Sequence, residues 1–196
     1  HTELIPYIYS SAAYSYELEK PTMRPTAGTY QYFLGDDILV APIFEEGSER
    51  TVIFPPGEWI YMFDQSKVYT AGVRKLTFPM DEYPVFIRKG AIIPMEVENC
   101  ITGFGSELSK GYTTVAVYPQ KGEKKFGLYE EGKKGTMLTY GKGDGSLRLI
   151  SGATERSLLW SVRGENLPMS VKDAAGNAIP RAASMAELVT MPAGCF

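Results

Sequence analysis

Histidine is almost missing from this sequence of 196 residues, which contains only His1. A Ser-His-Asp or Cys-His catalytic arrangement therefore has no base, and a histidine-ligated zinc site has no ligands. Cysteine is also scarce, and the spacing of Cys100 and Cys195 matches no zinc or redox motif. A disulfide between the two stays open, although the sequence favours two reduced thiols.

Long apolar runs and a strong charge of one sign are absent as well. No run approaches the ~18 residues of a membrane-spanning helix, and the first residues lack the pattern of a signal peptide. A net charge of −3 gives no reason to expect nucleic acid or an acidic membrane as a partner. The basic segments KGEKK (121–125) and KK (133–134) lie among glycines, which favours solvated turns over a binding patch.

Helical periodicity is present only near the N-terminus. Residues 3–19 predict a helix, and Pro21 and Pro25 predict its end. The apolar residues at helical spacing, which we expect on one face, are Leu4, Ile5, Ile8, Ala12 and Tyr16. A single apolar helix cannot bury this face alone, so the pattern predicts a partner for it.

Short runs of β-branched and aromatic residues, separated by Gly, Pro and Asp, fill the sequence after Gly28. The predicted strands of the first half are 29–34, 38–43, 50–54, 58–63, 74–78, 85–89 and 91–95. Those of the second half are 112–119, 125–131, 135–140, 146–151, 156–163, 168–173 and 186–191. Turns are predicted at 55–58, 88–91, 141–146 and 174–178. The polar segment 99–111 predicts a domain boundary or a long loop. The pattern predicts a mainly β fold with two consecutive antiparallel β-sandwich domains, preceded by the helix.

Adjacent acids mark the segment GDDILVAPIFEEG, in which Asp36 and Asp37 precede an apolar run and Glu45 and Glu46 follow it. Neighbouring residues of a strand point to opposite faces, so Asp36 and Asp37 cannot both address one ligand if a strand begins there. A Gly-Asp-Asp step before a strand is typical of a turn whose Asp side chain accepts hydrogen bonds from backbone amides. The sequence therefore favours a structural role for these acids.

Other candidate acids are scattered. A retaining glycosidase needs two carboxyl groups about 5–5.5 Å apart, and an inverting one needs them roughly 6.5–9.5 Å apart. The sequence alone does not exclude such a pair among four acids that stand at strand edges: Asp81, Glu82, Glu130 and Glu131. Solvated charges at strand edges are the simpler interpretation. Asp144 in GKGDGS is a lone acid, which is too few for a calcium loop. The residues alone therefore give no self-sufficient catalytic constellation.

Three blocks of the first half, in series, resemble glycoside hydrolase family 31. LIPYIYSSAAYSYELEKPTMRP (4–25) is similar to the late barrel helix and Pro-Val-Met-Arg-Pro step of that family. YQYFLGDDILVAPIFEEGSERTVIFPPGEWIYMF (30–63) resembles its Gly-Asp-Asp-Leu-Leu-Val-Ala-Pro-Val block, Pro-x-Gly-x-Trp turn and aromatic strand. YPVFIRKGAIIPM (83–95) resembles its Ile-Pro-Val-Phe-Val-Arg-x-Gly-x-Ile-Ile-Pro block. After residue 111 the resemblance is limited to TVAVYP (114–119) and LYEEG (128–132), which are similar to the distal C-terminal domain.

The resemblance implies a whole enzyme that is a retaining exo-acting α-glycosidase on a (β/α)8 barrel, of the α-glucosidase or α-xylosidase kind. The nucleophile of the family is an Asp in a Trp-x-Asp-Met-Asn-Glu-like motif, and its acid/base is a later Asp. Both lie upstream of the blocks found here, and neither motif occurs in this sequence. The resemblance therefore implies no catalytic, cofactor-binding or metal-binding residue and no cofactor. It implies two partners, a catalytic barrel in the same protein and the carbohydrate substrate of that barrel, and it indicates no localisation.

The implied division has three parts. Residues 1–27 would be the tail of the barrel, residues 28–98 a proximal β-sandwich and residues 99–196 a distal β-rich domain, and the whole sequence is expected to be a C-terminal piece of the enzyme. One departure is clear, because only TAGTYQYFL (26–34) stands where members carry a longer insert rich in Pro and Asp. TMRPTA (22–27) is then the candidate for the last barrel strand. The implied role of both β domains is to brace the barrel, without catalysis of their own.

Two alternatives of other classes remain. In the first, the distal domain is a carbohydrate-binding module with a stacking platform drawn from five aromatic residues: Tyr112, Tyr118, Tyr129, Tyr140 and Trp160. In the second, the chain is a structural module that forms homo-oligomers, because an uncovered apolar helix face drives association.

Overall fold

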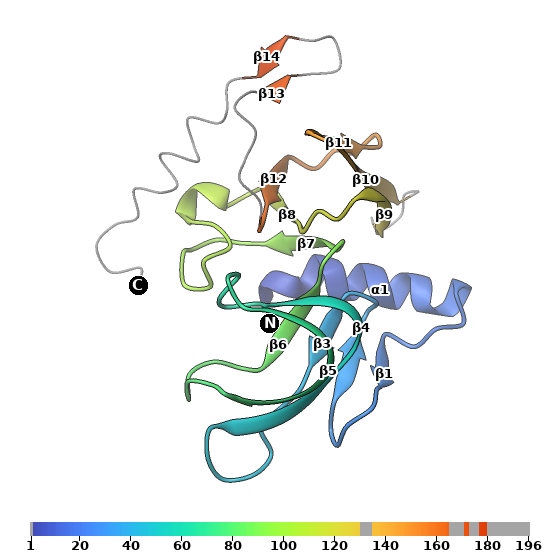
Figure 1. The fold of residues 1–196 in the computed structure, drawn as a ribbon. Helices are drawn as coiled ribbons and strands as arrows, with labels where there is room; N and C mark the ends of the chain where they lie inside the picture. Colours follow the sequence, from blue (N-terminus) through green and yellow to red (C-terminus); the bar gives the residue numbers. More distant parts are fainter. Residues whose placement is uncertain (1, 130–134, 165–170, 173–176, 180–196) are drawn as a thin grey trace.

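A computed structural model describes residues 2–129, 135–164, 171–172 and 177–179 (Figure 1). The chain begins with a 3-10 turn, η1 (Thr2–Leu4), and the helix α1 (Ile5–Glu17). A six-stranded antiparallel sheet follows. Its strands, in spatial order, are β1 (Met23–Pro25), β2 (Tyr32–Leu34), β3 (Ile38–Val40), β6 (Val85–Arg88), β4 (Glu49–Tyr61) and β5 (Val68–Thr77).

Two three-stranded sheets lie above it. The first has the order β12 (Leu158–Val162), β8 (Thr113–Val117) and β7 (Ile92–Glu96). The second has the order β11 (Ser146–Ser151), β10 (Thr136–Gly143) and β9 (Gly122–Leu128). The turn η2 (Glu107–Ser109) precedes β8, and β13 (Val171–Lys172) pairs with β14 (Ala178–Ile179). The predicted mainly β class with antiparallel sheets and one leading helix is confirmed, with a parallel pair between β8 and β12.

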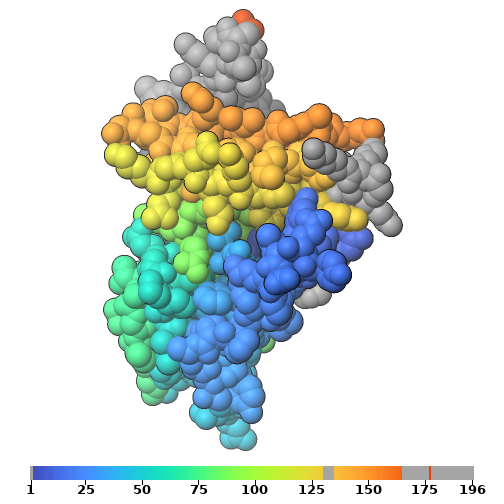
Figure 2. All heavy atoms as spheres, turned by 90° about the vertical axis from the view of Figure 1, so that its right-hand side faces the viewer, coloured from blue at the N-terminus to red at the C-terminus, as the bar shows by residue number. Residues whose placement is uncertain are grey.

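Strands β3 and β7 are each buried on both faces, because alternate residues of each strand belong to different cores. Ile38 and Val40 of β3 face a core with Leu4 and Tyr7, whereas Leu39 faces a second core around Trp59 on the other side of the sheet. In the same way β7 gives Ile93 to the first core and Ile92 to a third core beneath β9 and β10. Strands covered on both faces read as continuous apolar runs, which explains ILVAPI and AIIPM. The layers are visible on one face of the molecule, where β9 (yellow) rests on the N-terminal segment (blue) (Figure 2).

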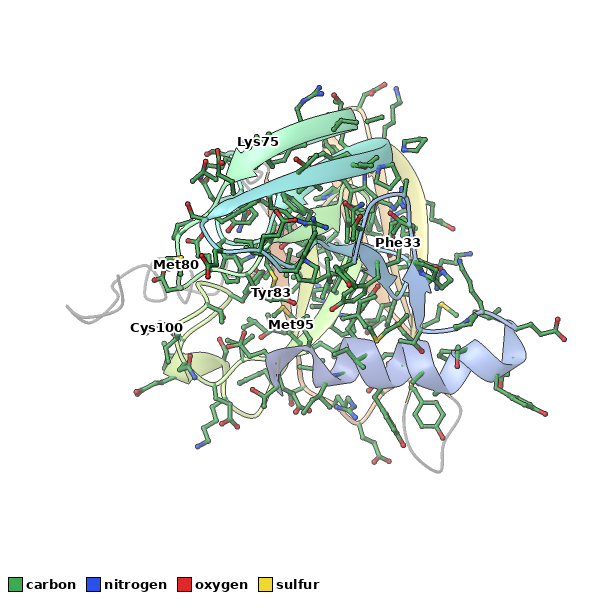
Figure 3. All side chains as sticks on the ribbon, turned by 90° about the horizontal axis from the view of Figure 1, so that it is seen from below. Phe33, Lys75, Met80, Tyr83, Met95 and Cys100 are labelled. Atoms are coloured by element: carbon green, nitrogen blue, oxygen red, sulfur yellow. The ribbon has the colours of Figure 1, made fainter. Side chains whose placement is uncertain are left out.

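Helix α1 lies between the six-stranded sheet and the upper strands (Figure 1). Its inner side buries Tyr7 and Ser10, and Met95 of β7 packs on that side (Figure 3). Ile5, which is 49% exposed, and Tyr16, which is 91% exposed, lie on the outer side. The predicted common face of Leu4, Ile5, Ile8, Ala12 and Tyr16 is therefore wrong, because the Tyr7 ring and hydroxyl take the buried position instead.

Three further expectations are corrected. The predicted turn 55–58 lies inside β4, where a bulge between Phe54 and Glu58 absorbs the two prolines and β5 pairs with both halves. KGEKK is not a solvated turn throughout, because β9 begins at Gly122. TMRPTA gives β1, an edge strand paired with β2. The division at residue 98 stays a prediction, although β7 pairs with β8 across it. The predicted strand 186–191, and the turn 174–178 except for residues 177–178, lie outside the described residues.

A glycine allows the closest approach between the helix and the six-stranded sheet. Gly35 has φ +62°, and a Cβ there would lie 2.2 Å from the Tyr7 hydroxyl oxygen. We expect Gly35→Ala to lower the free energy of unfolding by about 2–4 kcal/mol, because it combines left-handed strain with the displacement of a buried hydroxyl. Gly103→Ala is the matched control, because Gly103 has φ +73° and nothing within 4 Å of its added Cβ. Urea unfolding measures both, and equal losses would contradict the role of the Tyr7 contact.

Candidate functional site

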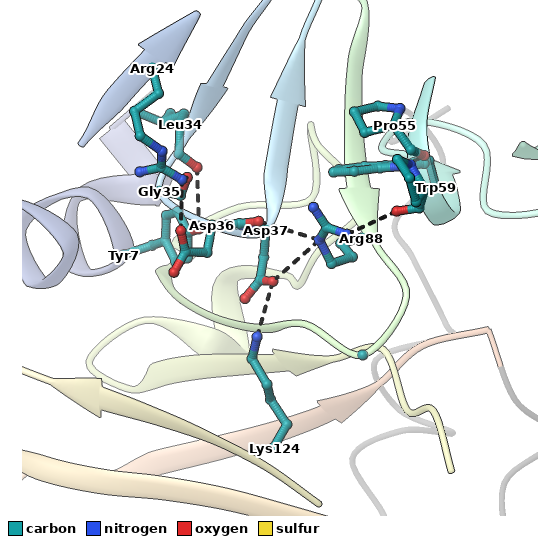
Figure 4. Close-up of polar contacts among 12 residues, drawn as sticks. Tyr7, Arg24, Leu34, Gly35, Asp36, Asp37, Pro55, Trp59, Arg88 and Lys124 are labelled. Carbon is teal, nitrogen blue, oxygen red and sulfur yellow. Dashed lines mark hydrogen bonds and ion pairs between the residues drawn. The ribbon is translucent and has the colours of Figure 1, made fainter. Parts of the chain in front are cut away.

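The Gly35–Asp37 turn joins three parts of the structure. The Asp37 side chain is 3% exposed, and its Oδ1 lies 3.2 Å from Nζ of Lys124 on β9 and 3.9 Å from Nε of Arg88 on β6 (Figure 4). The backbone N–H of Asp37 donates to the Tyr7 hydroxyl of α1 at 3.1 Å, and that hydroxyl donates to the Leu34 carbonyl at 3.2 Å. One residue therefore connects the two sheets through its buried carboxylate and the helix through its backbone N–H.

Asp36 has the opposite surroundings. Its Oδ1 lies 2.5 Å from Lys20 Nζ and 2.6 Å from Arg24 Nη2, and its side chain is 53% exposed. Burial alone would raise the pKa of Asp36, but the hydrogen bond and charge of Lys20, together with Arg24, hold this pKa below its usual value. Burial raises the pKa of Asp37, although Lys124 and Arg88 act against it.

Opposite pKa shifts in neighbouring acids are also a mark of acid/base pairs. Here they have another origin, because Asp37 is buried and bound by Lys124, while Asp36 is held at the surface by two cations. The sequence-based choice of a structural role for both residues agrees with this geometry. The turn separates the two acids, because the side chains of Asp36 and Asp37 point in different directions (Figure 4).

A groove lies beside this turn, with a volume of about 280 Å³. One wall is α1 with its C-cap residue Leu18, and the helix itself contributes Tyr7, Ser11 and Tyr14. The other walls are the segment from Lys20 to Asp37 and the strands β9 and β10. Its apolar floor and mixed charged rim have the character of a small-ligand site.

The outer side of α1 carries a separate feature, which we call the outer stripe: Ile5, Tyr9, Ala12 and Tyr16. All four are exposed, and their spacing of four, three and four residues places them on one side of the helix. Tyr16 is the most exposed member at 91%, whereas Tyr9 also contacts Tyr129, which follows β9. From Ile5 to Tyr16 the helix contains no charged residue, so the outer stripe is an uncharged and largely apolar surface.

The other sequence candidates are not brought together. Glu45 and Glu46 lie in an exposed turn, Glu82 accepts a hydrogen bond from the Tyr61 hydroxyl at 2.5 Å, and Asp144 pairs with Lys121 at 3.0 Å on the surface. Asp81 is exposed. His1, Glu130 and Glu131 lie outside the described residues. Within the described ranges, no group of three His, Cys, Asp or Glu residues could hold a metal ion.

The proposed distal stacking platform is not a surface feature. Tyr118 and Tyr140 are 1% and 2% exposed and belong to cores, while Tyr112 is exposed at the start of β8. Tyr129 instead contacts Tyr9 edge-on, with ring centroids 5.3 Å apart.

Cys100 is disulfide-bonded, so the expectation of a reduced thiol is wrong for this residue. Its potential partner Cys195 lies outside the described residues. In the part of the chain that the structure describes, no helix is long and apolar enough to cross a membrane.

Sequence reasoning missed Lys124 and Arg88. Lys124 was assigned to a solvated turn, yet its ammonium reaches a carboxylate 87 positions earlier in the chain. The available signal was the strand alternation of KGEKKFGL, in which Lys124, Phe126 and Leu128 share one side.

Loss of Lys124 should destabilise the protein. We expect Lys124→Met to lower the free energy of unfolding by about 1–3 kcal/mol at neutral pH, because the buried Asp37 carboxylate loses its nearest cation. The partial exposure of Lys124 limits the size of this loss. Lys121→Met is the control, because Lys121 and Asp144 are exposed and their pair contributes about 0–1 kcal/mol. Denaturant titration of both variants tests the difference, and a similar small effect in both would mean that the Asp37 pair is not stabilising.

The same variant should show a defined pH dependence. The folded-state pKa of Asp37 is raised, so the stability linked to this group is present below its unfolded pKa and is lost as pH rises through the folded value. Lys124 lowers that folded pKa, so its removal raises it further. The deficit of Lys124→Met relative to wild type should therefore be small in acid, where Asp37 is protonated, and should grow towards neutral pH. Unfolding free energies of both proteins at several pH values measure this deficit. A deficit that shrinks with rising pH would contradict the coupling between Lys124 and the Asp37 carboxylate.

The comparisons with known proteins agree with one another. Residues 10–93 match the glycosyl hydrolase family 31 C-terminal domain. An isomaltosyltransferase of Sporosarcina globispora is 30% identical over 139 residues, which cover 59% of this chain and 12% of that protein. An alpha-glucosidase of Saccharolobus solfataricus is 30% identical over 135 residues, which cover 63% of this chain and 19% of that protein.

Among solved structures, the cycloalternan-forming enzyme from Listeria monocytogenes, in complex with a pentasaccharide substrate, matches with a TM-score of 0.73 and 26% identity. The match covers 91% of this chain and 18% of that one. The chain therefore spans only a small part of the length of each relative. Over residues 10–93, this chain is therefore similar to the C-terminal domain of glycosyl hydrolase family 31.

Proposed function

We propose that this chain is the C-terminal β region of a retaining exo-acting α-glycosidase, and that it braces a catalytic barrel in the same protein. The observation that carries the proposal is the outer stripe of α1, which is exposed although it contains no charged residue. The relatives support it, because this chain matches less than a fifth of the alpha-glucosidase and of the isomaltosyltransferase. In this role the inner side of α1 is held by the β sheets and its outer side by the barrel.

The electrostatics of the junction suit a brace. Asp37, Lys124 and Arg88 hold the two β layers against each other, and Asp36 fixes the segment that leaves α1 through Lys20 and Arg24. A helix anchored in this way presents its outer stripe in a fixed position. Preorganisation of this kind lowers the entropic cost of docking.

The first test is the coding sequence upstream of the His1 codon. The proposal expects an open reading frame that encodes a barrel with a nucleophile strand and a later acid/base strand. A start codon directly before His1, without a barrel upstream, would overturn it.

The second test addresses the outer stripe. A separately produced barrel from that reading frame should bind the 196-residue chain, and Tyr9→Glu with Tyr16→Glu should weaken binding at least about 100-fold, because two aromatic contacts are lost and two charges are buried. Tyr83→Glu is the control, because Tyr83 is 49% exposed, much like Tyr9 at 50%, and lies outside α1. Calorimetric titration measures each affinity. Unchanged binding by the double variant would contradict docking through the stripe, as would a stable self-dimer through the stripe that excludes the barrel.

The chain by itself is expected to be inactive in hydrolysis. An aryl α-glycoside assay at stoichiometric protein should show no turnover above buffer. Turnover that persists through repurification would contradict the non-catalytic role.

A further inference from the structure

The aromatic side chains that line the groove beside the Gly35–Asp37 turn are held in place by close packing. The Tyr14 ring forms part of it and is seated on glycines, since a Cβ at Gly127 would lie 2.9 Å from the ring and one at Gly135 would lie 2.2 Å from the hydroxyl oxygen. Phe126 stacks on Tyr7 behind it, with ring centroids 5.4 Å apart and an interplanar angle of 18°. The aromatic surface of the groove is therefore positioned before any ligand arrives. The volume of about 280 Å³ is near the lower end of the roughly 300–1,000 Å³ of small-ligand pockets.

Each cation at the groove already lies beside a carboxylate, although the cations outnumber these carboxylates because Lys20 and Arg24 share Asp36. Lys20 and Arg24 bind Asp36, Lys124 binds Asp37, and Lys125 lies 3.1 Å from Glu123. A free anion would have to compete with a carboxylate for each of these cations. This arrangement favours an uncharged ligand over a phosphate or a carboxylate.

Hydroxyl groups are the open polar groups of the groove. Among the described residues, the side-chain hydroxyls of Ser11, Tyr14 and Thr22 have no hydrogen-bond partner. A hydroxyl both donates and accepts, which suits the hydroxyl groups of a sugar. An aromatic ring beside such groups gives the apolar surface on which the C–H face of a sugar ring packs.

The groove and the outer stripe lie on opposite sides of the same helix. Tyr7, Ser11, Tyr14 and Leu18 line the groove, and each follows a member of the outer stripe by two positions. Two positions correspond to about 200° around a helix.

We propose that this groove is a binding site for a neutral sugar. Tyr14 and Phe126 provide the apolar surface, and Ser11, Tyr14 and Thr22 provide hydrogen bonds. The site makes and breaks no covalent bond.

Calorimetric and NMR titration of the 196-residue chain with glucose and isomaltose tests the proposal. We expect saturable binding, with amide shifts at Ser11, Tyr14 and Gly127. Ser11→Leu removes a hydroxyl and fills the groove, and it should weaken binding at least about tenfold. Tyr14→Phe keeps the ring and should weaken binding about threefold to tenfold. Ala12→Leu is the matched control, because it adds an apolar side chain to the neighbouring position on the outer stripe, and it should leave sugar affinity unchanged.

Several results would overturn the proposal. These are the absence of saturable binding of either sugar, shifts confined to residues outside the groove, and equal effects of Ser11→Leu and Ala12→Leu. Inorganic phosphate is the competing probe, and saturable phosphate binding at these residues without sugar binding would also overturn it. The test is independent of barrel docking, because Ala12→Leu perturbs the outer stripe and Ser11→Leu perturbs the groove.

Discussion

The buried ion pair between Asp37 and Lys124 is the constraint on which the rest of the structure depends. A carboxylate that is 3% exposed needs compensation for its lost hydration, and here this comes from Lys124 of the upper layer and Arg88 of the lower layer. The backbone of the same residue binds the Tyr7 hydroxyl, so the position of the helix is coupled to the position of both layers. None of these groups can shift without leaving a buried polar group unpaired, and that requirement makes the three elements one unit.

This constraint explains why α1 has two chemically distinct sides. The Tyr7 hydroxyl holds the helix against the turn, and Ser10 donates to the Pro6 carbonyl while accepting from the Tyr129 amide. With rotation prevented, residues two positions apart must face different surroundings. The groove then forms where the helix leaves the turn, and the outer stripe faces solvent. The groove and the exposed outer stripe thus have one cause, which is the fixed rotation of the helix about its own axis.

Much of the fold follows from local pattern. The doubly covered strands β3 and β7, the 141–146 hairpin and the end of the helix before Pro21 were predictable because each depends on residues close in sequence. The failures have distant causes. Pro55 and Pro56 look like a turn, but pairing with β5 on both sides of them and the Trp59 Nε1 bond to the Pro55 carbonyl keep β4 continuous. The buried side of α1 and the role of Lys124 depend on contacts 30 and 87 positions away, which periodicity cannot contain.

The motif that resembles an active site is therefore a junction, and the reason is general. Adjacent acids before a buried strand are placed on opposite sides of the chain, so one of them enters the protein and the other remains in water. The buried acid must then recruit cations from neighbouring layers, and this makes it a centre of packing. The charge of Asp37 is thereby committed to Lys124 and Arg88, and that of Asp36 to Lys20 and Arg24, although both acids border the groove. A Gly-Asp-Asp step of this kind joins layers.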